Sequence, residues 1–474
     1  MRPSRSVAGL AAAVLLASAG PLSASSAERE LGRRFMLEAR GQLPLVDDPA
    51  VVEFLRSLGE RLVAQLGPQE FDYQFHVVRH PSLNAFAVPG GYIFFFSGLI
   101  GRVDSEDELV GVLGHEIAHV HAHHVTRQQT AGQVWNAAAL LGVLASLVNP
   151  VLGAGAIAAA QTAQLKYSRD FEQEADFLGL GLVGKAGYDP HALGSFFQEL
   201  LTEQRLNPVD LPPYMLSHPV TQDRIAKVES VIAAQKLTTP SGRPRVSLAL
   251  REAQAVVRGL DDPADEALQA YRRDAEAKPG DPVAHLILGR AYQAKGKLDA
   301  ARASLEEARR LGGAEGREQR ALGTVYLATH RPDDARVALE AYLADHPRDA
   351  WSHLELGKAH AARGDDEGAA LEYRRALTLV PAFGEAHRAL GLHLGRSGAE
   401  AEGFYHLALA ARDRGDLQQA YGFFQRAQAD LPKSDRRQRD IADALEELKP
   451  LVADARDLPP TDPRRRRRGP PGVQ

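Results

Sequence analysis

The sequence predicts two domains, an α+β domain that is mostly helical with a small β-sheet and an all-α repeat solenoid that follows it. Three observations predict this. The 474 residues exceed what one hydrophobic core usually supports. The first half mixes helix and strand patterns, whereas the second half is almost wholly helical and repeats. Between them, Thr238 to Pro244 is a turn-rich stretch with two prolines. We therefore expect domains at 28–237 and 248–450, joined by a linker at 238–247.

The composition excludes several classes of protein. The 56 basic and 61 acidic residues give a net charge of −5, so no broad basic surface for nucleic acid is expected. The absence of cysteine excludes disulfides, a thiolate zinc site and a cysteine nucleophile. It also excludes a lipid anchor on an N-terminal cysteine, so the protein is not expected to be a lipoprotein.

The first residues have the pattern of a secretory signal. Arg2 and Arg5 precede an apolar run from Val7 to Ala19, and the small residues Ser25 to Ala27 follow. The run is too short to span a bilayer comfortably, so a membrane-anchored helix is the weaker alternative. We predict a signal peptide over residues 1–27 and export to a bacterial periplasm.

The chemistry of the first domain begins with the motif His115-Glu116-Ile-Ala-His119. Ser105 and Glu108 form a Ser-x-x-Glu capping box, so a helix should begin there and carry the motif. On a helix, His115 and His119 lie one turn apart, and both imidazoles can reach one metal ion. Glu116 points toward water beside that ion, where it can accept a proton. This arrangement is typical of a zinc peptidase with one Zn²⁺ per chain.

A catalytic zinc needs a third protein ligand and an open position. Downstream, Glu172 and Asp176 lie one helical turn apart. We assign Glu172 as the third ligand and Asp176 as an outer hydrogen-bond acceptor that fixes the His119 ring. The spacing alone also permits Glu174 as the ligand. Past the motif, exposed or supporting roles are favoured for three further histidines: His121, His123 and His124.

A strand pair is predicted upstream of the motif. Pro89-Gly90-Gly91 is a turn between two β-rich runs, and the second run, which ends near Gly98, is apolar throughout. Beside a zinc helix, this second strand could add a peptide substrate by β-augmentation. We therefore assign Asn84, Gly90 and Gly91 to the substrate strand, with a purely structural hairpin as the alternative.

These motifs carry a resemblance. The motif at His115, followed by Glu172-x-x-x-Asp176, resembles the gluzincin family that contains HtpX and the CAAX prenyl proteases, as does the strand pair that begins at Asn84. In that family the first glutamate of the second motif is the zinc ligand, which implies Glu172. Those relatives span membranes. A signal sequence, a peptidase domain and C-terminal repeats are instead similar to the periplasmic β-barrel assembly-enhancing proteases.

The resemblance implies a protease for unfolded or misassembled protein substrates. It also implies contact between the repeats and the outer-membrane β-barrel assembly machinery. The residues themselves leave two other functions open. One is a chaperone or adaptor in which the repeats carry the function and the protease is latched, and the other is a non-peptidase zinc hydrolase.

Two apolar stretches lie between the metal motifs, at Val134 to Val148 and Val151 to Ala160. Each is shorter than the roughly 20 residues of a spanning helix. We expect a helical hairpin at the mouth of the cleft. A buried core hairpin and a membrane hairpin are the alternatives.

The repeats are marked by four glycines that are each 34 residues apart: Gly289, Gly323, Gly357 and Gly391. Small residues at this period resemble the tetratricopeptide repeat, in which paired helices approach closely. Register breaks after Gly398, so one helix is expected to serve two units. The tail at 451–474 holds Arg464 to Arg468 and is predicted to be disordered. It is either solvated or in peripheral contact with a membrane.

The last candidate is His218, which precedes Pro219, with Thr221 as a predicted cap of the next helix. One interpretation is an exposed histidine in a turn. In a second, His218 takes the open zinc position as a fourth ligand and latches the enzyme. In a third, it donates a hydrogen bond to the oxyanion of the scissile carbonyl.

Overall fold

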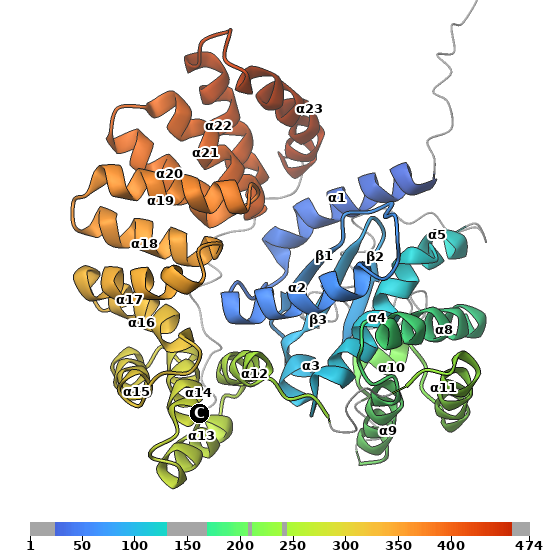
Figure 1. Cartoon of the computed structure of the whole chain (residues 1–474). Coiled ribbons are helices and arrows are strands. Elements are labelled where there is room, and N and C mark those ends of the chain that lie inside the picture. The colour runs from blue at the N-terminus through green and yellow to red at the C-terminus, as the bar shows by residue number, and fades with distance from the viewer. Residues whose placement is uncertain (1–23, 130–167, 207–210, 239–243, 457–474) are drawn as a thin grey trace, which may run out of the picture.

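The computed structural model describes residues 24–129, 168–206, 211–238 and 244–456 (Figure 1). The expected hairpin at 134–160 lies outside these residues, as does most of the predicted signal peptide. Within the described part of the chain, no helix combines the length and the apolar character needed to cross a membrane.

Among the residues described, the sheet of the first domain has three strands: β1 (Gln74–Val78), β2 (Ala85–Val88) and β3 (Tyr92–Phe96). Their order is β1-β3-β2, with β3 parallel to β1 and antiparallel to β2. The apolar β3 is therefore the central strand, and its hydrogen-bonding edges are both paired within the sheet. The prediction that this strand adds a substrate is wrong, and β2 is the edge strand of the hairpin.

The two faces of the sheet explain why β3 is apolar throughout. On one face, Phe94 and Phe96 pack with Phe35 and Met36 of α1 (Ala24–Gln42). On the other face, Ile93 and Phe95 belong to the main core of the domain. The further helices that the structure describes in this domain are α2 (Pro49–Val63), α3 (Ser97–Arg102), α4 (Glu106–His121), α5 (His124–Gln129), α8 (Arg169–Lys185), α9 (His191–Leu206), α10 (Pro213–Ser217) and α11 (Gln222–Gln235).

The helix α12 (Leu248–Asp261) follows the predicted linker and packs against both domains. Its buried side chains include Leu250, Val256 and Val257, which belong to the same core cluster as β3 and α4. The same helix also packs against α14. The helix predicted to open the repeat domain thus completes the core of the first domain. The domain boundary at 238–247 remains a prediction, because α12, which follows it, packs against both domains.

The second half of the chain is a solenoid of helical pairs (Figure 1). Its helices are α13 (Glu266–Ala277), α14 (Pro282–Ala294), α15 (Leu298–Arg310), α16 (Arg317–Ala328), α17 (Pro332–Asp345), α18 (Ala350–Ala362), α19 (Asp366–Leu379), α20 (Gly384–Arg396), α21 (Glu400–Asp413), α22 (Leu417–Asp430) and α23 (Arg437–Arg456). The helix pairs approach closely at the predicted glycines. A Cβ added to Gly323 would lie 2.4 Å from Leu339, and one added to Gly289 would lie 2.6 Å from Leu305. The α21 helix packs against both α20 and α22, as expected for a helix shared by two units.

The predicted start of the disordered tail, residue 451, lies inside a helix. The α23 helix continues to Arg456, and Val452 is buried one turn beyond Leu448 in its apolar face. The prediction is therefore wrong for residues 451–456, because helical burial persists past Pro450. Residues 457–474 lie outside the described chain.

Ion pairs join the solenoid to the first domain. Arg290 contacts Asp48 at 2.7 Å, and Arg320 contacts Glu53 at the same distance. Near the other end of the solenoid, the guanidinium of Arg40 in α1 lies 2.6 Å from the carboxylate of Asp413. Between these contacts is a cavity of about 770 Å³, lined by residues of both domains that include Phe75, Trp351 and Phe383. The solenoid thus encloses a partly apolar space against the first domain.

Candidate metal centre

The motif helix α4 begins where the capping pattern predicts. The side chain of Ser105 accepts a hydrogen bond from the backbone N–H of Glu108 at 3.3 Å. The Glu108 carboxylate in turn accepts one from the backbone N–H of Asp104 at 2.8 Å. The apolar side chains of this helix are buried, and so are both histidines of the motif. The capping and the core therefore fix the position of the motif along the helix.

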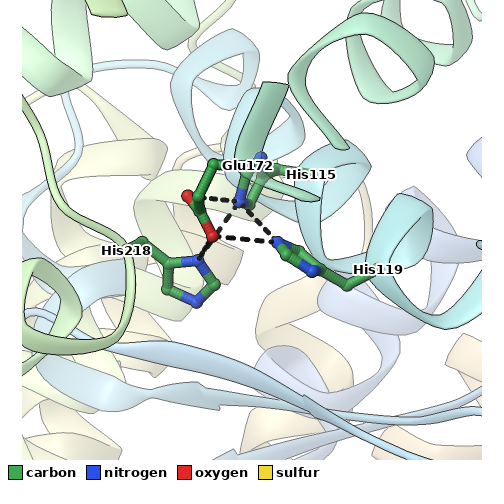
Figure 2. A group of neighbouring side chains, drawn as sticks. All are labelled: His115, His119, Glu172 and His218. Atoms are coloured by element: carbon green, nitrogen blue, oxygen red, sulfur yellow. Dashed lines mark hydrogen bonds and ion pairs between the residues drawn. The ribbon is translucent and has the colours of Figure 1, made fainter. Parts of the chain in front are cut away.

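Four buried side chains converge beside this helix (Figure 2). They are His115 and His119 from α4, Glu172 from α8 and His218 just after α10, and one ligand atom of each lies within 4.8 Å of all the others. The two Nε2 atoms of the motif histidines are 3.0 Å apart, and that of His119 is 3.4 Å from Glu172 Oε1. His218 Nδ1 is 3.0 Å from the same oxygen.

This donor set fits a zinc ion. Two imidazoles and one carboxylate match the catalytic zinc sites that leave a fourth position for water or substrate. The buried carboxylate of Glu116 adds a second observation, because its oxygens accept no hydrogen bond from the residues that the structure describes. Glu174, the alternative ligand, lies outside the group and pairs with Arg127 at 2.9 Å.

Close approach of α4 and α8 brings Glu172 to the histidines. A Cβ added to Gly179 of α8 would lie 2.9 Å from the backbone of Gly114 in α4. A side chain at either position would force the helices apart. Our sequence analysis missed these two glycines, although a glycine directly before the motif is a signal for close helix packing.

Asp176 supports His115, not His119 as predicted. Its Oδ1 lies 2.9 Å from His115 Nδ1. The reason is that α8 runs antiparallel to α4, so one turn beyond Glu172 leads toward the earlier histidine. Asp176 is therefore an outer hydrogen-bond acceptor as predicted, but the ring that it orients is that of His115.

Arg224 of α11 lies on the helix that Thr221 was predicted to cap, and the sequence did not single it out as a site residue. It is buried and contacts Asp176 Oδ1 at 2.8 Å and Glu172 Oε2 at 2.6 Å. Burial alone would raise the pKa of Asp176, but the Arg224 charge and the hydrogen bonds from Arg224 and His115 together outweigh it and lower that pKa to about 2. Thr221 caps this helix as predicted, by accepting from the backbone N–H of Arg224. The cap and the ion pairs together fix the guanidinium beside the ligands.

Of the other histidines past the motif, one is exposed at the surface and one contacts the ring of His119. His121 is exposed, and His123 contacts the Glu28 carboxylate at 2.9 Å, away from the ligand group. His124 is buried, and its Nδ1 lies 2.9 Å from His119 Nδ1. His124 therefore occupies the position beside His119 that we predicted for Asp176.

Glu116 and His218 face each other across the site. Glu116 Oε1 is 3.5 Å from His218 Nε2, and burial raises the pKa of the Glu116 carboxyl. His218 is 1% exposed, which contradicts the interpretation as an exposed histidine in a turn. Both groups can therefore act on a molecule bound at the ligand group.

The predicted substrate-strand residues lie in and beside β2, which packs against α4. Asn84 precedes β2, and its backbone carbonyl accepts from the N–H of Phe96. Gly90 and Gly91 form the turn with φ values of 87° and 100°. A Cβ on either would approach a backbone carbonyl at 2.8 Å, so these two glycines are needed by the turn itself.

Comparison with known proteins gives two family matches. Residues 49–232 match the model of Peptidase family M48, and residues 320–382 match that of the tetratricopeptide repeat. The metallopeptidase domain, its zinc cofactor and the repeats predicted from the sequence are thereby confirmed.

Three relatives illustrate the similarity. A putative beta-barrel assembly-enhancing protease of Vibrio cholerae is 34% identical over 250 residues, which cover 51% of each protein. The beta-barrel assembly-enhancing protease of Escherichia coli is 31% identical over 218 residues, 44% of each protein. The mitochondrial metalloendopeptidase OMA1 of Schizosaccharomyces pombe is 32% identical over 175 residues, 36% of this chain and 50% of that one. The chain spans about half the length of the curated relatives that it matches.

Proposed function

Because residues 49–232 form a Peptidase family M48 domain, we propose that this protein is an exported zinc metalloendopeptidase that cleaves misassembled proteins in a bacterial periplasm. The observation that carries the proposal is the buried group of His115, His119 and Glu172 with the Glu116 carboxylate beside it. No adaptor function requires these four groups in one buried site.

His115, His119 and Glu172 hold the zinc in this proposal. When bound, zinc polarises the scissile carbonyl and makes water a better nucleophile at neutral pH. Glu116 accepts the proton of the attacking water and delivers it to the leaving amine. Burial raises the pKa of Glu116, which brings this base closer to the pH at which it must also act as an acid.

The edge strand β2 is the proposed contact for the substrate backbone. It lies against α4, and within the described part of the chain the strand order β1-β3-β2 leaves one of its edges without a strand partner. A peptide that adds to this edge is bound through main-chain hydrogen bonds, which suits a protease for many unfolded sequences. Of the three residues predicted for the substrate strand, Asn84 is the one with a side chain, and it directly precedes β2.

The solenoid is the proposed site for recruitment. Repeat arrays offer extended concave surfaces for protein chains. The cavity of about 770 Å³ between the domains presents aromatic side chains to a client next to the peptidase domain. We propose that the repeats also contact the outer-membrane β-barrel assembly machinery, which is supported by the names of the bacterial relatives. Peripheral membrane contact through the arginine-rich tail is a further part of the proposal.

A substrate-trapping experiment tests this role. The Glu116→Gln variant should retain zinc but not cleave, so its substrates stay bound. Capture of unfolded or misassembled outer-membrane proteins from a periplasmic extract is expected. A variant that captures no periplasmic protein, while the parent cleaves an unfolded test protein, would contradict the substrate class and leave the peptidase activity intact.

A latched adaptor is the second candidate function. It is favoured by His218, whose Nδ1 lies 3.0 Å from Glu172 Oε1 and 3.3 Å from His115 Nε2, within the ligand group. If the repeats alone carry the function, Glu116→Gln should complement a strain that lacks the protein as well as the parent does.

We expect His218→Ala to raise the rate of casein cleavage. As a fourth ligand, His218 occupies the position that water and substrate need, and its removal frees that position. The measurement compares the variant with the parent at matched zinc content, and His121→Ala serves as a control at an exposed position. A rate lower by about 10²–10³ would instead identify His218 as an oxyanion donor.

A further inference from the structure

We infer that His124 is a positioning residue that holds the ring of the metal ligand His119 by a hydrogen bond, in a relay of polar contacts that ends at Glu174 and Arg127. The inference rests on the proposed zinc site and goes beyond it. It concerns α5 and the first turns of α8, which lie side by side although 39 residues of sequence separate Gln129 from Arg169.

The relay is a continuous set of polar contacts. His124 Nδ1 lies 2.9 Å from His119 Nδ1. On the other side of the ring, His124 Nε2 lies 3.2 Å from Glu174 Oε2. The same oxygen accepts a hydrogen bond from Arg127 Nη1 at 2.9 Å. Each ring nitrogen of His124 therefore has a polar partner at hydrogen-bonding distance.

The ligand role of His119 sets the direction of every proton in the relay. Its Nε2 faces the ligand group and must keep a lone pair, so the ring proton is on Nδ1. That N–H donates to Nδ1 of His124, which must then be the unprotonated nitrogen. His124 consequently carries its proton on Nε2, the nitrogen that lies 3.2 Å from the Glu174 carboxylate, which Arg127 also holds. With both rings neutral, this arrangement is compatible with each of the contacts given above.

Packing holds His124 in place for this role. Its side chain is fully buried, and its ring stacks on Phe171 of α8 with a centroid separation of 4.6 Å and an interplanar angle of 15°. The guanidinium of Arg127 lies 4.8 Å from the centre of the same aromatic ring. The relay therefore has little freedom to rotate away from His119.

The two motif histidines are thus supported in different ways. The ring of His115 is held by a carboxylate, Asp176, which is 2.9 Å away and paired with Arg224. The ring of His119 is held by a neutral imidazole, and the carboxylate is one step further away. Outer hydrogen bonds of this kind fix the orientation of the ligand ring, and their loss typically costs 10–100-fold in metal affinity.

The test is the zinc affinity of the full-length protein, measured by competition with a chromophoric chelator. His124→Leu, which fills the space but accepts no hydrogen bond, is expected to weaken zinc binding by about 10–100-fold. His124→Asn places an amide oxygen near the position of Nδ1 and is expected to restore most of the affinity. His121→Leu, at the exposed last residue of α4, is the matched control and should bind zinc as the parent does.

A second readout reports the proton positions directly. In ¹⁵N-histidine NMR of the zinc-loaded parent, His124 should be protonated on Nε2 and not on Nδ1. This measurement needs no variant, so it decides the matter even if His124→Leu fails to fold. A proton on His124 Nδ1, or equal zinc affinity of a folded His124→Leu and the parent, overturns the relay. A parent that binds no zinc overturns the zinc site itself, which is a different result.

Discussion

Replacing Glu116 with glutamine is expected to lower the rate of protein cleavage by about 10²–10⁴-fold, the usual contribution of a general base. Glutamine keeps the shape of the side chain but cannot accept the proton of the attacking water. Zinc content should not change, because Glu116 is outside the set of ligand atoms. Initial rates on casein, normalised to bound zinc, measure the effect.

The control for this variant is Glu60→Gln, which makes the same chemical change in α2 at an exposed side chain. It should cleave as fast as the parent. If Glu116→Gln retains more than about a hundredth of the parent rate at equal zinc content, Glu116 is not the base in this mechanism.

A fragment that ends at Pro244 is expected to lack a cooperative unfolding transition, whereas one that ends at Asp262 should fold. The difference is α12, whose fully buried Leu250 and Val257 belong to the core of the first domain. Each buried side chain of this size contributes about 1.5–3 kcal/mol. Together these two side chains contribute about 3–6 kcal/mol, which is comparable to the lower end of the free energy of unfolding of a domain, about 5–15 kcal/mol.

Hydrogen bonds add to this difference. The backbone N–H of Arg245 donates to Asp107 at 2.8 Å, and the Arg258 side chain donates to the carbonyl of Gly101 at 2.7 Å. Thermal melting of residues 28–244 and 28–262, followed by far-UV circular dichroism, makes the comparison. A cooperative transition at the same temperature in both fragments would show that α12 does not stabilise the peptidase domain.

Much of this architecture is predictable because its signals are local. The 34-residue spacing of the glycines reports the close helix pairs, and the cap at Ser105 with its apolar periodicity places the metal-binding helix. The pair His115 and His119 needs only helical geometry to share an ion. Glu172 was assigned from its motif and from resemblance, and the structure brings it to the two histidines.

The features that sequence did not reveal depend on how distant elements pack. Asp176 faces His115 because α4 and α8 are antiparallel, and spacing along one helix does not contain that information. Arg224 comes from 109 residues beyond His115, on a helix whose amphipathic pattern is ordinary. The central place of β3 follows from its parallel pairing with β1, which requires a crossover connection and is not signalled by the hairpin turn.

The zinc content of the protein tests the central claim most directly. Elemental analysis of full-length protein, purified without added metal, is combined with casein cleavage before and after treatment with a chelator. The account predicts one zinc per chain, loss of cleavage when zinc is removed and recovery when zinc is returned. A metal-free preparation that still cleaves protein would contradict it.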